Sequence, residues 1–265
     1  MANSPSGESV AQRIARILET FDADRSVQTA SEIARRAGLP GSTAHRLTLE
    51  LVATGLLDRD EDGRLRLGMH LWEVAQRGSR ALRLRQAALP FMERVQARVR
   101  EHTQLAVLEQ GEALFLERLS HPDAVSNITR IAGRLPLHAS SSGLVLLAFA
   151  DERERERTLS RPLPAVSRES VTDPAELRAL LERIRREGVV IARGFVESVS
   201  TGVAVPIRQR DSVIAALSVI LPRDAPTAGA VDELRRAAAG IARALDAPTD
   251  FASRSTGNRS ARDAS

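Results

Sequence analysis

The sequence predicts an α+β protein with two parts: an N-terminal winged helix-turn-helix, then an antiparallel sheet domain with flanking helices. Three observations carry this prediction. Residues 31–55 have the pattern of two short helices joined by a tight turn. A short hairpin pattern follows directly, at residues 56–68. The second half then mixes strand candidates with capped helices, which favours a sheet covered by helices.

The first helix of the pair has clear boundaries. Thr29 and Glu32 have the spacing of a capping box, and Gly38 stands where a helix ends. After Leu39 and Pro40, a second helix is predicted from about residue 41 to Ala53.

The second helix has two distinct faces. Ala44, Leu47 and Leu51 recur at steps of three and four and form its buried stripe. Its other side carries polar groups near the N-terminal end, namely Ser42, Thr43, His45, Arg46 and Glu50. Hydroxyl, imidazole and guanidinium groups at this place suit the DNA major groove, although an ordinary helical hairpin with a solvated face has the same pattern.

The hairpin pattern after this helix resembles a wing. Leucines flank residues 60–63, a turn in which Gly63 can adopt positive φ. The alternation predicts Arg64 and Arg66 on one face, with Leu65 and Leu67 turned inward. With an amphipathic helix beginning after Ser9, three helices and a wing predict DNA binding far more specifically than two helices. The expected DNA contacts are Arg36, Ser42, Thr43, His45, Arg46, Arg64 and Arg66.

Composition excludes several classes of protein. All 38 Lys+Arg residues are Arg, and there is no Cys, which rules out disulfides and thiol chemistry. Residues 1–78 hold ten Arg and eleven acidic residues, a net charge of −1. Binding to DNA would therefore require the arginines to lie on the side that faces the DNA and the acidic residues to point away from it. No apolar run approaches the roughly 18 residues of a spanning helix, and no secretory signal is evident. We therefore expect a cytoplasmic protein with no membrane partner.

The remaining chain divides into connector helices and sheet elements. Met69–Arg77 and Ser79–His102 are predicted helices of the connector. Further helices are expected at 140–150, at 173–188 and at 230–245, with the charged run 151–157 as the solvated continuation of the first. The strand candidates are 104–110, 113–120, 125–131, 189–193, 201–207 and 213–221.

At this point the sequence resembles a known family. SVAQRIARILETF and LPGSTAHRLTLELVATGLLDRDEDGRLRLGMHLWE resemble the N-terminal domain of IclR-type transcriptional regulators. The similarity continues through GRLPLHASSSG, VTDPAELRALLERIRREGV and GVAVPI…AALSVILP, and covers roughly residues 9–245. It implies a GAF-like effector domain, connector helices that aid dimerisation, and a homodimer or homotetramer on double-stranded DNA with a pseudo-palindromic operator.

The expected organisation follows from the pattern and the resemblance together. Residues 1–8 would be a disordered tail, and 9–78 the winged helix-turn-helix with the start of the linker. Residues 79–247 would be the GAF-like effector-binding and oligomerisation domain, and 248–265 a second disordered tail.

Catalysis has weak support in this sequence. His138 with Ser140, Ser141 and Ser142 offers a base and nucleophiles, but G-x-S-x-G is absent. The five His are scattered, and no Gly-rich loop matches a phosphate or dinucleotide motif. We expect no enzyme activity, no metal and no cofactor. The alternative is a small-molecule-binding enzyme whose N-terminal domain serves only oligomerisation.

A ligand site is the better interpretation of the same segment. The chain enters a helix there, so the amides of Ser141 and Ser142 would be free donors suited to a carboxylate. The resemblance places both serines at the effector, whereas the alternative is that they merely cap the helix. The expected remainder of the pocket is Leu105, Val107, Leu137, Ala192, Gly202 and Val203.

Three departures from the family pattern bear on the ligand. Members of the family that bind small oxo-acids carry an acidic residue and a cysteine where this chain has Ala192 and Gly202, and the family usually has lysine where this chain has Leu144. The pocket would therefore be roomier and less polar, with Ser198, Ser200 and Thr201 as substitutes for the lost polar groups. We expect an aromatic or branched acid with one carboxylate. Its identity, and whether it relieves repression or supports activation, are left open.

Overall fold

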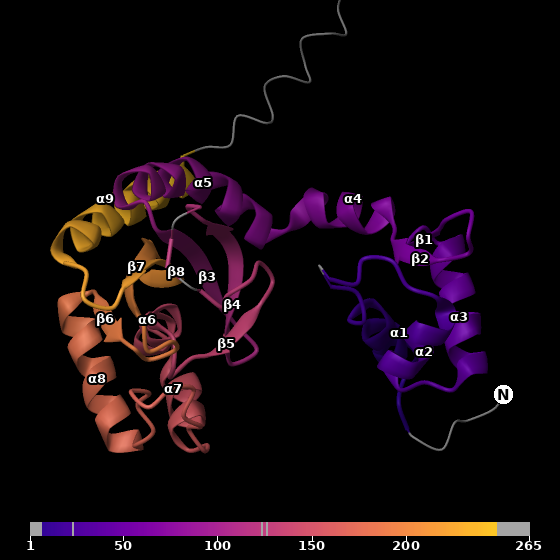
Figure 1. The fold of residues 1–265 in the computed structure, drawn as a ribbon, viewed down its shortest axis with the longest axis horizontal. Helices are drawn as coiled ribbons and strands as arrows, with labels where there is room; N and C mark the ends of the chain where they lie inside the picture. The colour runs from indigo at the N-terminus through magenta and orange to yellow at the C-terminus, as the bar shows by residue number, and fades with distance from the viewer. Residues whose placement is uncertain (1–6, 23, 123, 126, 248–265) are drawn as a thin grey trace, which may run out of the picture. The chain divides into compact units, whose positions relative to one another are not determined.

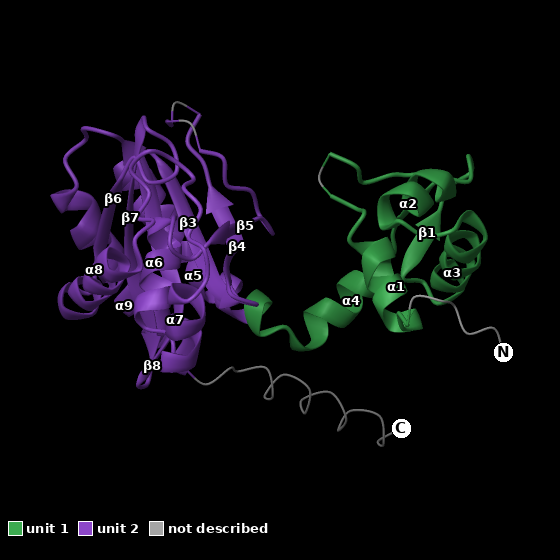
Figure 2. Cartoon of the chain, turned by 90° about the horizontal axis from the view of Figure 1, so that it is seen from below, with its two compact units in different colours: residues 1–82 green, residues 83–265 purple. Residues whose placement is uncertain are grey.

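The computed structural model describes residues 7–22, 24–122, 124–125 and 127–247. The chain forms two compact units, residues 1–82 and residues 83–265 (Figure 2). Most of the two expected tails, residues 1–6 and 248–265, lies outside the described residues.

Unit 1 has three helices and a small wing, followed by a fourth helix (Figure 1). Its elements are α1 (Val10–Leu18), α2 (Ala30–Ala37), α3 (Gly41–Ala53), β1 (Leu57–Arg59), β2 (Leu65–Leu67) and α4 (Met69–Gly78). The predicted capping box of α2 is present. Thr29 Oγ1 accepts from the Glu32 amide at 3.2 Å, and the Thr29 amide donates to Glu32 Oε2 at 2.8 Å. The Thr29 amide and, at 2.9 Å, Thr29 Oγ1 both donate to Glu32 Oε2, which holds the pKa of the Glu32 carboxyl below its usual value.

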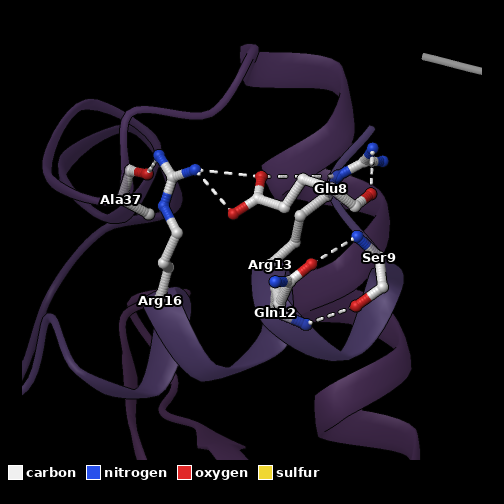
Figure 3. Close-up of polar contacts among 6 residues, drawn as sticks. All are labelled: Glu8, Ser9, Gln12, Arg13, Arg16 and Ala37. Atoms are coloured by element: carbon white, nitrogen blue, oxygen red, sulfur yellow. Dashed lines mark hydrogen bonds and ion pairs between the residues drawn. The ribbon is translucent and has the colours of Figure 1, made fainter. Parts of the chain in front are cut away.

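An arginine joins the first two helices. Figure 3 shows that Arg16 donates to both carboxylate oxygens of Glu8, each at 3.0 Å, and to the carbonyl oxygen of Ala37 at the end of α2. The guanidinium thus satisfies a terminal carbonyl of α2. Glu8 was expected in the mobile tail, but these contacts hold it against the helices.

The core of unit 1 fixes the wing on the helices. Ile17, Ile33, Leu47, Leu57 and Leu65 are completely buried. Buried Gln28 bridges the parts: its amide donates to Leu65 O at 2.9 Å, and its Nε2 donates to Thr20 O at 3.0 Å. The prediction that Leu67 turns inward was wrong: Leu67 is the last residue of this three-residue strand and is 48% exposed.

Unit 2 is built on a six-stranded antiparallel sheet of order β5-β4-β3-β8-β7-β6. Its strands are β3 (His102–Glu109), β4 (Glu112–Leu119), β5 (Arg134–Pro136), β6 (Val190–Arg193), β7 (Ser200–Gln209) and β8 (Ser212–Pro222). Its helices are α5 (Arg80–Val99), α6 (Ser141–Ala148), α7 (Glu152–Leu159), α8 (Pro174–Glu187) and α9 (Ala228–Asp246).

Helices cover both faces of this sheet. Side chains of α5 and α9 form one core with Leu105, Val203 and Leu217 of the sheet. Side chains of α6 and α8 form a second core on the other face, with Ala106, Phe115 and Ala204. Figure 1 shows the two layers, α5 with α9 on one face and α6, α7 and α8 on the other. The alternation of each strand assigns neighbouring residues to different cores.

Two secondary-structure predictions for unit 2 were wrong. The described residues of 125–131 form no strand, because their amides bond to side chains: Val125 N donates to Glu101 Oε2 at 3.0 Å, and Ile128 N to Glu197 Oε2 at 3.3 Å. The charged run at 151–157 does not continue α6. Asp151 caps a separate helix, α7, by accepting from the Glu154 amide at 2.7 Å.

A β-bulge in β4 changes which way its side chains face. Leu105 pairs with Glu117 whereas Ala106 pairs with Phe115, so Leu116 is an extra residue. Phe115 therefore faces α6, while Glu117 faces α5. Glu117 is 3% exposed, and its Oε2 lies 2.5 Å from Arg85 Nη2 of α5.

This ion pair predicts a non-additive effect on stability. Arg85→Leu removes the counter-charge of a buried carboxylate, which keeps its hydrogen bond from the Arg118 amide at 2.9 Å. The variant should be destabilised by about 2–3 kcal/mol, less than for a fully buried pair because Arg85 is partly solvated. Adding Glu117→Leu should recover most of the loss, since no buried charge remains. Urea unfolding of the single and double variants measures this, and additive losses would contradict it.

Candidate functional sites

The exposed face of α3 carries the residues that the sequence singled out. Ser42, His45 and Arg46 are exposed and Thr43 is half-buried. Arg46 Nη1 lies 2.5 Å from Glu50 Oε1, with the Arg46 side chain 57% exposed. Because a solvated i,i+4 pair is weak, Arg46 can leave Glu50 for a base or a phosphate.

The arginines around α3 are also accessible. Arg36 is oriented by its Nη1 donating to Gln28 Oε1 at 2.8 Å. Arg66 Nε lies 3.8 Å from Asp58 Oδ2, and the Arg64 amide donates to Asp60 Oδ1 at 2.8 Å. Gly63 takes φ +76°, as the predicted turn required. All seven predicted contact residues thus reach the surface of unit 1.

The second site is a cavity in unit 2 between the sheet, the start of α6 and two loops. Its space free of protein atoms, including the part open to solvent, is about 400 Å³. Its lining is Gln104, Phe115, Asn127, Thr129, Leu135, Ser140, Ser141, Ser142, Ala192, Phe195, Val196, Glu197, Ser200, Gly202 and Ile220.

The start of α6 presents hydrogen-bond donors to this cavity. Ser140, not Ser141 or Ser142, is the capping residue, since its Oγ accepts from the Gly143 amide at 3.0 Å. The amides of Ser141 and Ser142 have no acceptor among the described residues. They are therefore free donors at a positive helix end, where an anion binds well.

Polar side chains connect α6 to the opposite wall. Ser142 Oγ lies 2.9 Å from Ser218 Oγ, which donates to Gln104 Oε1 at 3.4 Å. Gln104 Nε2 donates in turn to Thr129 Oγ1, and Thr129 bonds to Asn127 Oδ1. Sequence reasoning missed Gln104, Asn127 and Thr129. A buried glutamine within an apolar strand was the only signal that could have indicated them.

Four predicted wall residues do not line the cavity. Leu105, Val107 and Val203 face α5 and α9, because the alternation of β3 and β7 turns Gln104 and Gly202 to the cavity instead. Leu137 is buried against α6 behind the lining. Ser141, Ser142, Ala192 and Gly202 do lie together at the cavity.

The other lining residues combine apolar walls with one acidic group. Phe115, Leu135, Phe195, Val196 and Ile220 supply apolar surface, while the Glu197 carboxylate accepts from Ile128 N. Of the polar substitutes predicted, only Ser200 lines the cavity. Thr201 Oγ1 instead donates to Arg223 O at 2.8 Å, and Ser198 is exposed.

The segment with His138 does not form a nucleophile and base pair. His138 Nε2 lies 2.9 Å from the Pro164 carbonyl oxygen, and the Ser140 and Ser142 hydroxyls have the partners described above. Within the described ranges, no group of three or more His, Asp or Glu could hold a metal ion. Every helix described is too short or too polar to cross a membrane.

A helix-turn-helix with a wing, joined to a domain with a ligand cavity, defines a ligand-responsive transcriptional regulator. Comparison with known proteins identifies the family. Residues 10–61 match the IclR helix-turn-helix domain, and residues 78–247 match the C-terminal domain of bacterial IclR transcriptional regulators. The chain belongs to the IclR family, with a DNA-binding domain and an effector-binding domain.

Similar proteins cover nearly the whole chain. The HTH-type transcriptional regulator XynR of Escherichia coli is 30% identical over 250 residues, covering 89% of this chain and 97% of XynR. An IclR homolog from Microbacterium hydrocarbonoxydans, crystallised with 4-hydroxybenzoate, is 60% identical with a TM-score of 0.87, over 91% of this chain and 100% of that chain. A homolog from Microbacterium sp. strain HM58-2 is 58% identical with a TM-score of 0.62, at the same coverage.

Gly202 predicts a stability effect at the cavity wall. A Cβ at this position would lie 2.5 Å from Ser141 Oγ and 2.9 Å from Ser141 Cβ. Gly202→Ala should therefore push α6 from β7 and destabilise by about 1–3 kcal/mol. Combining it with Ser141→Gly, which removes both contacting atoms, should restore much of the loss. Thermal unfolding tests this, and an unrescued double variant would refute the steric explanation.

Proposed function

We propose that this regulator binds a pseudo-palindromic operator as a homodimer or homotetramer and changes its operator affinity when an aromatic monocarboxylate fills the cavity. The observation that carries the ligand class is the pair of free amides at the start of α6, in a cavity with two phenylalanines. The relative crystallised with 4-hydroxybenzoate supports the same class.

On the DNA side, α3 would enter the major groove. Arg46 would exchange Glu50 for a guanine edge, with Ser42, Thr43 and His45 nearby. Arg36, Arg64 and Arg66 would contact phosphates. Two copies of the chain would place two such helices on successive half-sites, which explains why the operator should be pseudo-palindromic.

On the ligand side, the carboxylate would accept from the amides of Ser141 and Ser142. The ring would lie between apolar side chains, including Phe115 and Phe195. Ala192 keeps that wall uncharged. A binding role is favoured over catalysis, because His138 and the Ser142 hydroxyl already bond to other protein groups.

Effector and operator would be coupled through the arrangement of the oligomer. A ligand that binds one arrangement more tightly shifts operator affinity by its differential binding energy, typically about 1–3 kcal/mol. The same coupling requires operator DNA to change the affinity for the effector by an equal factor.

Arg46 provides the test of the DNA surface. Arg46→Ala should cost about 1–3 kcal/mol of specific binding, since a bidentate contact with guanine is lost. Gel-shift titration with the chain's own upstream DNA measures this. Arg178→Ala, which breaks a solvated pair with Glu156 on unit 2, is the matched control and should bind normally. Unchanged affinity for Arg46→Ala would remove this residue from the interface.

The effector class is tested by calorimetry and thermal shift. 4-Hydroxybenzoate or benzoate should stabilise the protein more than pyruvate or glyoxylate do. Ala192→Asp should weaken the aromatic acid by about tenfold or more, because it adds a negative charge to an apolar wall. Stronger stabilisation by a small keto-acid would contradict the proposal, and Ala192→Ser controls for added bulk.

A further inference from the structure

We infer that Asn127 recognises a second, uncharged oxygen of the effector, and so selects para-hydroxylated aromatic acids over unsubstituted ones. This inference rests on the proposed function and adds a second polar contact to it. Nothing in the sequence pattern pointed to Asn127. It comes from hydrogen bonds that only the folded chain reveals.

The orientation of the Asn127 amide is fixed by its neighbour. Its Oδ1 accepts from the Thr129 amide at 3.0 Å and from Thr129 Oγ1 at 2.8 Å. Since an oxygen must accept these two bonds, Nδ2 points the other way. Nδ2 is buried and has no hydrogen-bond acceptor among the described residues, and Asn127 lines the cavity. A buried donor of this kind requires an acceptor, which the ligand can supply.

This donor is held by a different strand from the one that contacts the start of α6. Ser141 packs against Gly202 of β7, whereas Thr129, which holds Asn127, bonds to Gln104 of β3. β8, whose Ser218 bonds to Ser142 of α6, lies between those two strands, so the strands that hold the two groups of donors are one to two strand spacings, about 5–10 Å, apart. That is the scale of one aromatic ring with a polar group at each end. A carboxylate at α6 would direct a para substituent towards Asn127.

Charge selects the kind of substituent. Ile128, the next residue after Asn127, donates its amide to Glu197 Oε2 at 3.3 Å, so a carboxylate lies beside this end of the cavity. A second carboxylate on the ligand would be repelled there. A phenol oxygen accepts from Asn127 Nδ2 without that cost, which favours a hydroxyl over a dicarboxylate.

The test compares two acids that differ only in the para hydroxyl. Calorimetric titration of the full chain with 4-hydroxybenzoate and with benzoate should give about tenfold tighter binding of the hydroxylated acid. Asn127→Asp keeps an oxygen for both Thr129 donors but lacks the Nδ2 donor. It should bring the ratio of the two affinities to about one, while its negative charge weakens both acids and the loss is larger for 4-hydroxybenzoate. Asn127→Ala should lower the ratio in the same way.

Ile128→Ala is the matched control, because this neighbouring side chain is 52% exposed and does not line the cavity. It should retain the preference for 4-hydroxybenzoate. If wild-type protein binds both acids but the preference survives Asn127→Asp, or both affinities fall equally, this inference fails alone. If the wild-type protein binds neither acid, the proposed effector class fails and this inference fails with it. Melting curves confirm that each variant is folded.

Discussion

The effector domain depends on the close approach of the start of α6 to β7. Gly202 has no side chain, so Ser141 packs directly on the strand, and a Cβ there would lie within 2.5 Å of Ser141 Oγ. Ser140 caps the helix and leaves the next two amides for the cavity. The free amides at the start of α6, the space in the cavity and the contact between Ser142 and Ser218 thus all depend on the absence of a side chain at position 202. A larger residue at 202 would alter all three together.

The two faces of the sheet pack against different parts of the domain, and β4 contributes side chains to both faces. One face forms the cavity wall through Phe115, and the other packs on α5 and α9. The bulge at Leu116 lets the same strand present Phe115 to the cavity and Glu117 to Arg85 of α5. A change at the cavity wall is therefore one short strand segment away from a buried ion pair on the helix that begins the domain.

Local signals predicted the elements well, whereas the cavity depended on contacts remote in sequence. The capping box of Thr29, the turn at Gly63 and the stripe of Leu47 and Leu51 each act within a few residues, so pattern alone identified them. Whether Gln104 or Leu105 lines the cavity depends on which face of the sheet α6 covers. A shift of one residue along β3 would exchange the two side chains. Residues 125–131 were predicted as a strand from their sequence, but the amides of Val125 and Ile128 donate to the carboxylates of Glu101 and Glu197.

The charge of the DNA-binding unit has consequences for how it finds its operator. Ten Arg against eleven acidic residues through residue 78 give little attraction for DNA of arbitrary sequence. Several arginines are paired with acids at the surface, as in Arg46–Glu50 and Arg66–Asp58. Because such solvated pairs cost little to break, an operator phosphate or guanine can replace the acid. A non-specific site offers fewer well-placed acceptors. With the contacts proposed for Arg46 and Arg66, weak overall charge would favour specificity over affinity, and a second copy of the chain on the same operator would add affinity.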